Sequence, residues 1–260
     1  MIEQRNFNVA SQSIIESLES GDIKIEKILK STMMNEIKYY LVKFIGKSYM
    51  HCMWIQVNVV SQYVDDVDPK NIEINDDYFI PERVVDHDNA GRYLVKWKGL
   101  DYDNLTWEFK DEICNRDIID EYEERNHIYD DENLKNKRIL NVNDIVDKFG
   151  EDKFKLGELE IIKKCFIKWR NKESGVILNY NWINIIYFFE LIKEEVVGPF
   201  LIIAPLSEIP NIERILEEFK DIKYFSLTGN QALKQEIFNH ELFFHGKPRF
   251  NVLILSSDKY

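Results

Sequence analysis

Apolar and polar residues alternate most regularly at residues 93–99, whose sequence is YLVKWKG. In an extended chain Tyr93, Val95 and Trp97 fall on one face, and the residues between them fall on the other. Gly99 supplies the permissive backbone that a tight turn needs. The stretch therefore predicts a strand with two unlike faces that ends in a turn.

The same pattern occurs once earlier in the chain. Residues 40–55 (YLVKFIGKSYMHCMWI) and residues 93–108 (YLVKWKGLDYDNLTWE) are identical at seven of sixteen positions and lie 53 residues apart. A repeat of this kind indicates two modules of the same architecture.

Further elements flank the two repeats. An apolar strand precedes each repeat, IKIEKIL at 23–29 and FIPERVV at 79–85, and residues 30–38 are expected to form a loop. A strand and a short helix are expected at 54–63, and a longer helix at 111–126. Each module is therefore predicted to be a small sheet closed by a helix.

The pattern changes beyond residue 139. Apolar runs alternate there with helical periodicity, which predicts a parallel sheet with helical crossovers. The run FLIIA at 200–204 has the character of a strand buried on both faces. The expected strands are 175–178, 200–204, 223–227 and 250–255, and the expected helices are 182–195, one that begins near Ser207, and 232–242.

The expected fold class is thus α+β combined with α/β. The expected domains are a flexible arm at 1–21, a first module at 22–64, an acidic linker at 65–77, a second module at 78–128, a linker at 129–150 and a partial α/β lobe at 151–260. We call the modules at 22–64 and 78–128 the first copy and the second copy.

Composition narrows the function classes. A net charge of −12 makes the whole molecule repel nucleic acid, so any contact with DNA would need a local basic patch. The three cysteines and five histidines have no spacing typical of zinc sites or disulfides, and no catalytic set of residues stands out. No signal peptide or membrane span is predicted, and an intracellular, reducing environment is expected.

The two copies resemble the tandem chromodomains of the CHD (chromodomain-helicase-DNA-binding) family. The motifs that carry the resemblance are YMHCMW at 49–54 and KWKGLDY at 96–102, and the His-Cys-x-Trp form is most similar to the Mi-two/Pickle branch. The segments GPFLIIAPLS at 198–207 and FNVL at 250–253 resemble the first lobe of the Swi/Snf-type ATPase of that family. The resemblance implies two chromodomains followed by a partial helicase-like lobe.

The resemblance also implies ATP and Mg²⁺ as cofactors, but the expected phosphate-binding loop is missing. The glycine-lysine-threonine triplet that binds phosphate falls on Tyr180, Asn181 and Trp182, and the adenine-reading glutamine falls on Glu160. The family's magnesium motif is expected beyond Tyr260. We therefore expect no ATPase activity and no bound cofactor or metal. Tyr180 and Trp182 are interpreted either as filling the vacated space or as a new partner surface.

Methyl-lysine-reading chromodomains hold a trimethylammonium group in a cage of aromatic rings. The three cage positions fall on Phe79, Trp97 and Leu100 in the second copy, and on Ile23, Phe44 and Lys47 in the first copy. The first cage is expected to be degenerate. For Trp97, a ligand-facing position and a core position both remain open. The pair Lys96 and Lys98 is interpreted either as a contact for phosphate or an acidic partner, or as a solvated face.

The sequence thus predicts a nuclear, chromatin-associated binding protein with an inactive ATPase lobe. The expected partners are a histone tail, nucleosomal DNA and subunits of remodelling complexes. Two alternatives stay open: a fragment of a remodelling ATPase or DNA translocase whose other lobes lie on a missing or split portion, and a remnant that is not expressed. The sequence does not indicate which histone lysine is read, or the oligomeric state.

Overall fold

The computed structural model describes residues 7–64, 74–130, 138–141, 143–150, 154, 157–174 and 181–257. The chain forms two compact units, Met1–Tyr122 and Glu123–Tyr260, which we call the N-terminal and C-terminal units. The strand expected at 175–178 and most of the expected acidic linker lie outside the described residues.

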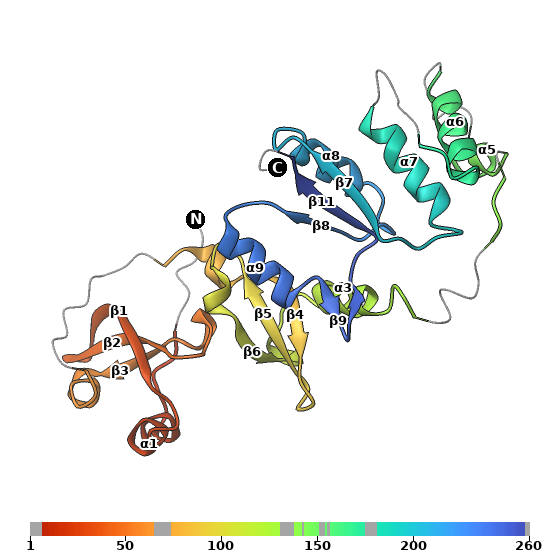
Figure 1. Ribbon diagram of the computed structural model, residues 1–260. Helices are drawn as coiled ribbons and strands as arrows, with labels where there is room; N and C mark the ends of the chain where they lie inside the picture. The colour runs from red at the N-terminus through yellow and green to blue at the C-terminus, as the bar shows by residue number, and fades with distance from the viewer. Residues whose placement is uncertain are drawn as a thin grey trace. The chain divides into compact units, whose positions relative to one another are not determined.

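The N-terminal unit contains two antiparallel sheets of three strands each, in the orders β1-β2-β3 and β4-β5-β6 (Figure 1). The strands are β1 (Ile25–Met34), β2 (Ile37–Phe44), β3 (Met53–Gln56), β4 (Pro81–His87), β5 (Arg92–Trp97) and β6 (Thr106–Phe109). The helices are α1 (Gln12–Ser20), α2 (Val57–Val60) and α3 (Asp117–Asn126), with 3-10 turns η1 (Tyr49–His51), η2 (Asp76–Phe79), η3 (Tyr102–Asn104) and η4 (Lys110–Glu112).

The two sheets share one register. Leu41 opposes Trp54 in the first copy, and Leu94 opposes Trp107 in the second copy, so the sequence offset of 53 is also the structural offset. The first strand of each sheet carries two register irregularities, which bend it across its partner. The repeat in the sequence is therefore a repeat in the backbone.

Residues 30–38 differ from the loop that was expected there. They extend β1 and β2 into a long hairpin whose turn is formed by Asn35 and Glu36, with φ angles of 49° and 65°. Positive φ at both central residues matches the right-handed twist of the strands. Because the sequence has no glycine at this turn, its pattern predicted a loop and not a hairpin.

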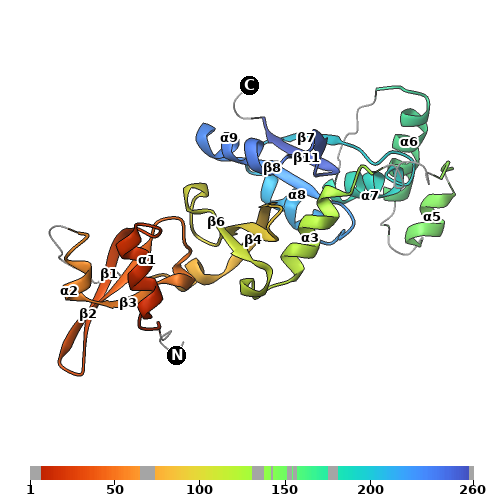
Figure 2. The same cartoon turned by 90° about the horizontal axis from the view of Figure 1, so that it is seen from below.

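Residues 7–20 also differ from the expected flexible arm. Ser11 precedes α1, and Gly21 ends it in a left-handed conformation. Leu18 is buried in the core of the first copy, and α1 lies beside the β1–β3 sheet (Figure 2). Burial of one apolar side of this short helix is what orders the segment.

The helix that closes the second copy begins later than expected. α3 starts at Asp117 rather than near residue 111, because Lys110–Glu112 forms a separate 3-10 turn and the Asn115 side chain accepts from the Asp117 N–H at 3.1 Å. The apolar side of α3 packs on the β4–β6 sheet through Ile118, Ile119 and Tyr122. In the first copy the corresponding helix, α2, has a single turn.

In the C-terminal unit, β7 (Phe200–Ala204), β11 (Val252–Ser256) and β8 (Tyr224–Leu227) form a parallel sheet in that order. This confirms the expected parallel arrangement for three of the four strands. The other elements are α5 (Asp144–Phe149), α6 (Glu158–Arg170), α7 (Trp182–Ile192), α8 (Ile209–Leu216), α9 (Gln231–His240) and the short hairpin β9 (Phe243–Phe244) and β10 (Lys247–Pro248). Helices α6 and α7 lie side by side (Figure 1).

Burial in this unit follows the expected periodicity with one exception. Ile212, Ile215 and Leu216 of α8 are buried against the sheet, as the helical pattern predicts. β7 is not buried on both faces, since Leu201 and Ile203 are 55% and 57% exposed. Among the described residues, no helix is both long and apolar enough to cross a membrane.

Candidate functional site

Each copy contains a buried lysine in the second strand of its sheet. Lys43 donates to Glu26 at 2.8 Å and to the Phe44 carbonyl oxygen at 3.1 Å. The ammonium group also lies 5.4 Å from the centre of the Tyr49 ring. These contacts neutralise a charge that would otherwise be costly to bury.

The second copy repeats this arrangement residue by residue. Lys96 donates to Glu82 at 3.1 Å and to the Trp97 carbonyl oxygen at 3.0 Å, and it lies 5.7 Å from the Tyr102 ring centre. Lys98 is half-exposed and pairs with Asp77 at 3.1 Å. Lys96 is therefore neither a contact for phosphate or an acidic partner nor part of a solvated face, because its charge is paired inside the second copy.

A chain of hydrogen bonds joins the second copy to the first. The Trp97 indole N–H donates to Thr106 Oγ1 at 2.8 Å, and Thr106 Oγ1 donates to Glu108 at 2.5 Å. The other oxygen of Glu108 contacts His51 Nε2 at 2.7 Å. Because His51 belongs to η1, the chain ends in the first copy.

The pKa values of the last two groups shift in opposite directions. The hydrogen bond to Glu108 raises the pKa of His51 above its ordinary value, although burial acts against this. Burial pushes the pKa of Glu108 up, but its hydrogen bonds to His51 and Thr106 outweigh burial and lower the pKa. The two groups are thus held as a partly buried ion pair.

His51, Glu108 and Glu112 are the one set of possible metal ligands among the described residues, with ligand atoms within 4.8 Å of one another. His51 and Glu108 already bond each other directly, and Glu112 accepts from the Phe109 backbone N–H at 2.9 Å. The contacts present account for all three groups.

Two of the three predicted cage residues of the second copy lie in separate hydrophobic clusters. Trp97 is 1% exposed and packs with Val84, Val95 and α3, so the structure gives it the core position. Phe79 is 4% exposed and packs in a cluster with Leu29 and Tyr49 of the first copy. Leu100 is half-buried and touches both clusters.

In the first copy, by contrast, two of the three corresponding residues share one hydrophobic cluster. Phe44, at the position equivalent to Trp97, is buried in the core of the first copy, and Ile23 packs on the edge of that core. Lys47 is exposed on the turn that follows β2. Phe44 and Trp97 therefore each lie in the hydrophobic core of their own copy.

The sequence contained signals for these positions. Trp97 shares a strand face with Val95, which is fully buried, but this alternation alone did not distinguish a core position from a ligand-facing one. Lys96 was interpreted as a partner contact or as part of a solvated face. The signal for its pairing was Glu82, which stands in the repeat where Glu26 stands before Lys43. The His51–Glu108 contact spans 57 residues and left no local signal.

The residues at the expected nucleotide site have structural contacts. The Asn181 side chain caps α7 by accepting from the Ile183 N–H at 3.3 Å. Trp182 packs against the core of the parallel sheet, and its indole N–H donates to Glu208 at 3.2 Å. Glu160 is exposed on α6 and pairs with Lys164 at 3.0 Å. Tyr180 lies outside the described residues.

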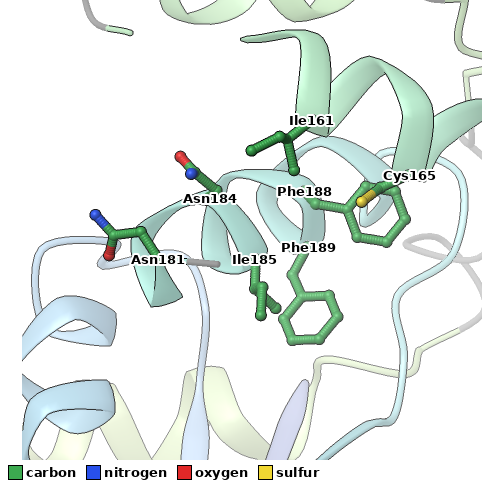
Figure 3. Close-up of a pocket in the computed structure, with 7 residues that line it drawn as sticks. All are labelled: Ile161, Cys165, Asn181, Asn184, Ile185, Phe188 and Phe189. Atoms are coloured by element: carbon green, nitrogen blue, oxygen red, sulfur yellow. The ribbon is translucent and has the colours of Figure 1, made fainter. Parts of the chain in front are cut away.

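A cavity of about 220 Å³ lies between α6 and α7. Figure 3 shows its apolar wall, which is formed by Ile161, Cys165, Ile185, Phe188 and Phe189. Asn181 and Asn184 are the polar residues at its margin, and the Asn184 side-chain oxygen is buried without a hydrogen-bond partner among the described residues. No lysine or hydroxyl lines this cavity, so its described wall does not suit a triphosphate.

Comparison with known proteins assigns one part of the chain directly. Residues 79–125 match the Chromo (CHRromatin Organisation MOdifier) domain. This segment begins at Phe79 and contains β4, β5, β6 and most of α3. The second copy is therefore a chromo domain.

Longer relatives match most of the chain. Chromodomain-helicase-DNA-binding protein 7 of Gallus gallus is 26% identical over 284 residues, which cover 93% of this chain but 9% of that protein. Its counterpart in Homo sapiens is 25% identical over 288 residues, covering 91% of this chain and 9% of the relative. The CHD3-type chromatin-remodeling factor CHR7 of Arabidopsis thaliana is 26% identical over 259 residues, covering 84% of this chain and 21% of the relative.

The chain thus spans less than a quarter of the length of these relatives, and the matched region extends well beyond the chromo domain. The expected resemblance is confirmed: this chain carries a chromo domain at residues 79–125 and is similar, over most of its length, to a segment of the chromodomain-helicase-DNA-binding family.

Proposed function

We propose that this chain is a nuclear, chromatin-associated protein that binds a histone tail, nucleosomal DNA or both through its N-terminal unit. The observation that carries the proposal is the chromo domain at 79–125, within a chain similar to chromodomain-helicase-DNA-binding proteins. We further propose that the first copy is a second chromodomain, because the strand order and register of its β1–β3 sheet are repeated in the β4–β6 sheet of the second copy.

The contacts between the two copies support a joint binding platform. Phe79, from the second copy, completes a cluster whose other buried members belong to the first copy, namely Leu29, Leu41, Tyr49 and Cys52. The ion pair between His51 and Glu108 adds a polar contact. Apolar burial and a charge pair at one junction favour a fixed arrangement of the two copies over independent motion.

We propose that the C-terminal unit does not hydrolyse ATP and serves as a folded scaffold. The segment 179–183 contains none of the glycine, lysine, serine or threonine residues that position a triphosphate and its metal in a phosphate-binding loop. Instead, the Asn181 side chain caps the start of α7, and the Trp182 indole N–H donates to Glu208. An amide cap and an indole ring have no positive charge to stabilise phosphate.

Thermal denaturation tests this part of the proposal. Saturating nucleotide raises the free energy of unfolding of a protein that binds it by about 2.7 kcal/mol at a hundred times Kd. We expect the melting temperature of the whole chain to be the same with and without ATP and Mg²⁺. A magnesium-dependent rise in melting temperature would contradict the inactive-lobe proposal.

Recognition of trimethyl-lysine by Phe79, Trp97 and Leu100 requires both rings to leave their clusters. Each caged ring would contribute about 0.5–2 kcal/mol to binding, whereas moving a buried aromatic side chain into water costs about 1.5–3 kcal/mol. We therefore propose that trimethylation of a histone lysine adds little to the affinity. Truncating Trp97 or Phe44 to alanine is a poor test, because both variants would damage a core.

Peptide binding to the intact protein is the better test. Histone-tail peptides carrying an unmodified or a trimethylated lysine, and a short DNA duplex, are titrated against the whole chain by fluorescence anisotropy. We expect at least one of these probes to bind, with affinities for the two peptide forms that differ by less than about threefold. Failure of every probe to bind would refute the binding proposal. A preference above about tenfold for the trimethylated peptide would instead support the methyl-lysine cage.

The fragment hypothesis stays open beside this proposal. It is favoured by the small share of each relative that the chain spans, 9% of chromodomain-helicase-DNA-binding protein 7. On that hypothesis the exposed Leu201 and Ile203 of β7 would be covered by a further part of the ATPase. Detection of the protein in cells by mass spectrometry, with its mass measured intact, distinguishes a separate chain from a piece of a longer one.

A further inference from the structure

Helix α7 turns one face toward α6, and the two helices enclose the cavity of about 220 Å³ between them. Asn184, Ile185 and Phe188 line it from α7, and Ile161 and Cys165, four residues apart, line it from α6 (Figure 3). For comparison, an apolar cavity of about 150 Å³ holds one benzene molecule. The space between α6 and α7 is therefore large enough for an aromatic ring with short substituents, about nine non-hydrogen atoms in all.

Asn184 places a buried polar group in this apolar wall. The residue is 4% exposed, and its Oδ1 atom has no hydrogen-bond partner among the described residues. The neighbouring backbone N–H groups are already used, because the Ile183 N–H donates to Asn181 Oδ1 at 3.3 Å and the Asn184 N–H donates to the Asn181 carbonyl oxygen at 3.0 Å. The first turn of α7 therefore leaves Asn184 Oδ1 as an acceptor without a donor.

This acceptor suits a mostly apolar molecule better than it suits a water. A buried carbonyl oxygen without a donor is costly, and buried polar groups normally find a partner. A buried water, however, needs about two to four polar partners. The described wall offers Asn184 and, at the margin, Asn181, whose Oδ1 atom is already bonded to the Ile183 N–H. A molecule that is apolar over most of its surface and carries one donor matches this wall.

The wall also selects against charge. No charged side chain lines the described part of the cavity. Burial raises the pKa of Cys165 above its ordinary value, so the thiol is uncharged at neutral pH. An ionised ligand would lose its hydration here without gaining a partner of opposite charge. The molecule that fits is therefore neutral.

We propose that the cavity between α6 and α7 binds a small, neutral aromatic molecule whose single hydroxyl group donates to Asn184 Oδ1. The aromatic ring would pack against Phe188 and Phe189, since aromatic pairs stabilise each other beyond their buried area. The arrangement is that of small-molecule sites in general, with a largely apolar wall and one polar group that fixes the orientation. The proposal concerns the C-terminal unit and does not rest on binding to chromatin.

Cys165 makes binding measurable in the whole chain. A molecule in the cavity covers this thiol, whereas Cys114 is exposed in the N-terminal unit and reports the reagent's own rate. Alkylation by N-ethylmaleimide is followed at each cysteine by mass spectrometry of peptides, over a series of ligand concentrations. The probe is para-ethylphenol, and the matched control is para-ethyltoluene, which has a methyl group in place of the hydroxyl.

We expect para-ethylphenol to slow the alkylation of Cys165, but not of Cys114, with a Kd on the order of 1 mM for a molecule of about nine non-hydrogen atoms. Asn184→Leu replaces the unpaired amide by an apolar side chain of similar size. In this variant the Kd of para-ethylphenol should rise at least about fivefold, because its hydroxyl is buried without an acceptor, and the Kd of para-ethyltoluene should not rise. Protection by para-ethyltoluene also shows that the cavity of the variant is intact.

Three outcomes would overturn the proposal. Alkylation of Cys165 that neither compound slows at about ten times the expected Kd would mean that the cavity takes no such molecule. Equal changes in Kd for the two compounds in Asn184→Leu would mean that Oδ1 does not select a donor. Protection by ATP with Mg²⁺ but not by para-ethylphenol would mean that the cavity is a nucleotide site. None of these outcomes bears on histone or DNA binding, so failure here is distinct from failure of that proposed function.

Discussion

At the scale of single residues, the repeated lysine–glutamate pairs have unequal members. The Lys96 side chain is 9% exposed, whereas the Glu82 side chain is 34% exposed. Removing the exposed partner leaves a charge in the core, but removing the buried partner leaves a carboxylate that water can reach. The two halves of one ion pair should therefore differ in their effect on stability.

We predict that Glu82→Gln lowers the free energy of unfolding by about 2 kcal/mol and Lys96→Met by less than about 1 kcal/mol. The pair Glu26 and Lys43 offers an internal replicate, with side-chain exposures of 32% and 5%. Urea denaturation of the four single variants measures the difference. If replacing the lysine by methionine lowers stability more than replacing the glutamate by glutamine, in both copies, the argument from the cost of an unpaired buried charge is wrong.

The contact between His51 and Glu108 makes a pH-dependent contribution to stability. The raised pKa of His51 means that its contribution is complete below its ordinary value of 6.5 and is lost as pH rises through the folded value. The lowered pKa of Glu108 means that its contribution is complete above 4.5 and is lost as pH falls through the folded value. The pair should therefore stabilise the fold most between these two ordinary values.

We predict that His51→Ala costs about 2 kcal/mol at pH 5.5, since it leaves a buried carboxylate without its partner, and costs less at pH 9. Denaturation midpoints measured at both pH values test this. His127→Ala is a control, because His127 pairs with Asp130 at an exposed position and should change stability by no more than about 0.5 kcal/mol. A cost for His51→Ala that does not vary with pH would show that packing, rather than charge, carries the contact.

At the scale of elements, the β1–β2 hairpin has a turn without glycine. Glu36 has a φ of 65°, a conformation that costs a residue with a Cβ atom about 1–2 kcal/mol. Glu36→Gly should therefore stabilise the first copy by about 0.5–1 kcal/mol, after the greater freedom of glycine in the unfolded chain is counted. Glu36→Ala keeps the Cβ atom and should bring no such gain. Equal changes in stability for the two substitutions would show that loss of the glutamate side chain, and not relief of the backbone conformation, causes the effect.

The same elements show what the sequence could predict. The repeat at an offset of 53 predicted that Trp54 and Trp107 hold equivalent places, and the registers confirm it. The start of α3 was set too early because Lys110–Glu112 forms the separate turn η4, and the Asn115 side chain accepts from the Asp117 N–H where the helix begins. Residues 7–20 were expected to be mobile, because a helix with one buried leucine gives a weak periodic signal.

At the scale of the whole molecule, the two copies share a fold but not the same surroundings. The sequence indicated which strand residues were equivalent, so Phe44 and Trp97 were compared correctly. It did not indicate that both rings would lie in cores, because a cage position and a core position lie on the same strand face. The junction built by Phe79, Tyr49 and the His51–Glu108 pair depends on contacts between distant segments.

Binding of the whole chain to nucleosomes tests the central claim most directly. Fluorescently labelled nucleosomes are titrated with the purified protein, with and without ATP and Mg²⁺, and anisotropy is followed. The account predicts saturable binding with one Kd in both conditions, because the N-terminal unit binds and the C-terminal unit does not use nucleotide. Absence of binding up to about 100 μM, the weak limit of non-specific DNA binding, or a Kd that changes with ATP would contradict it.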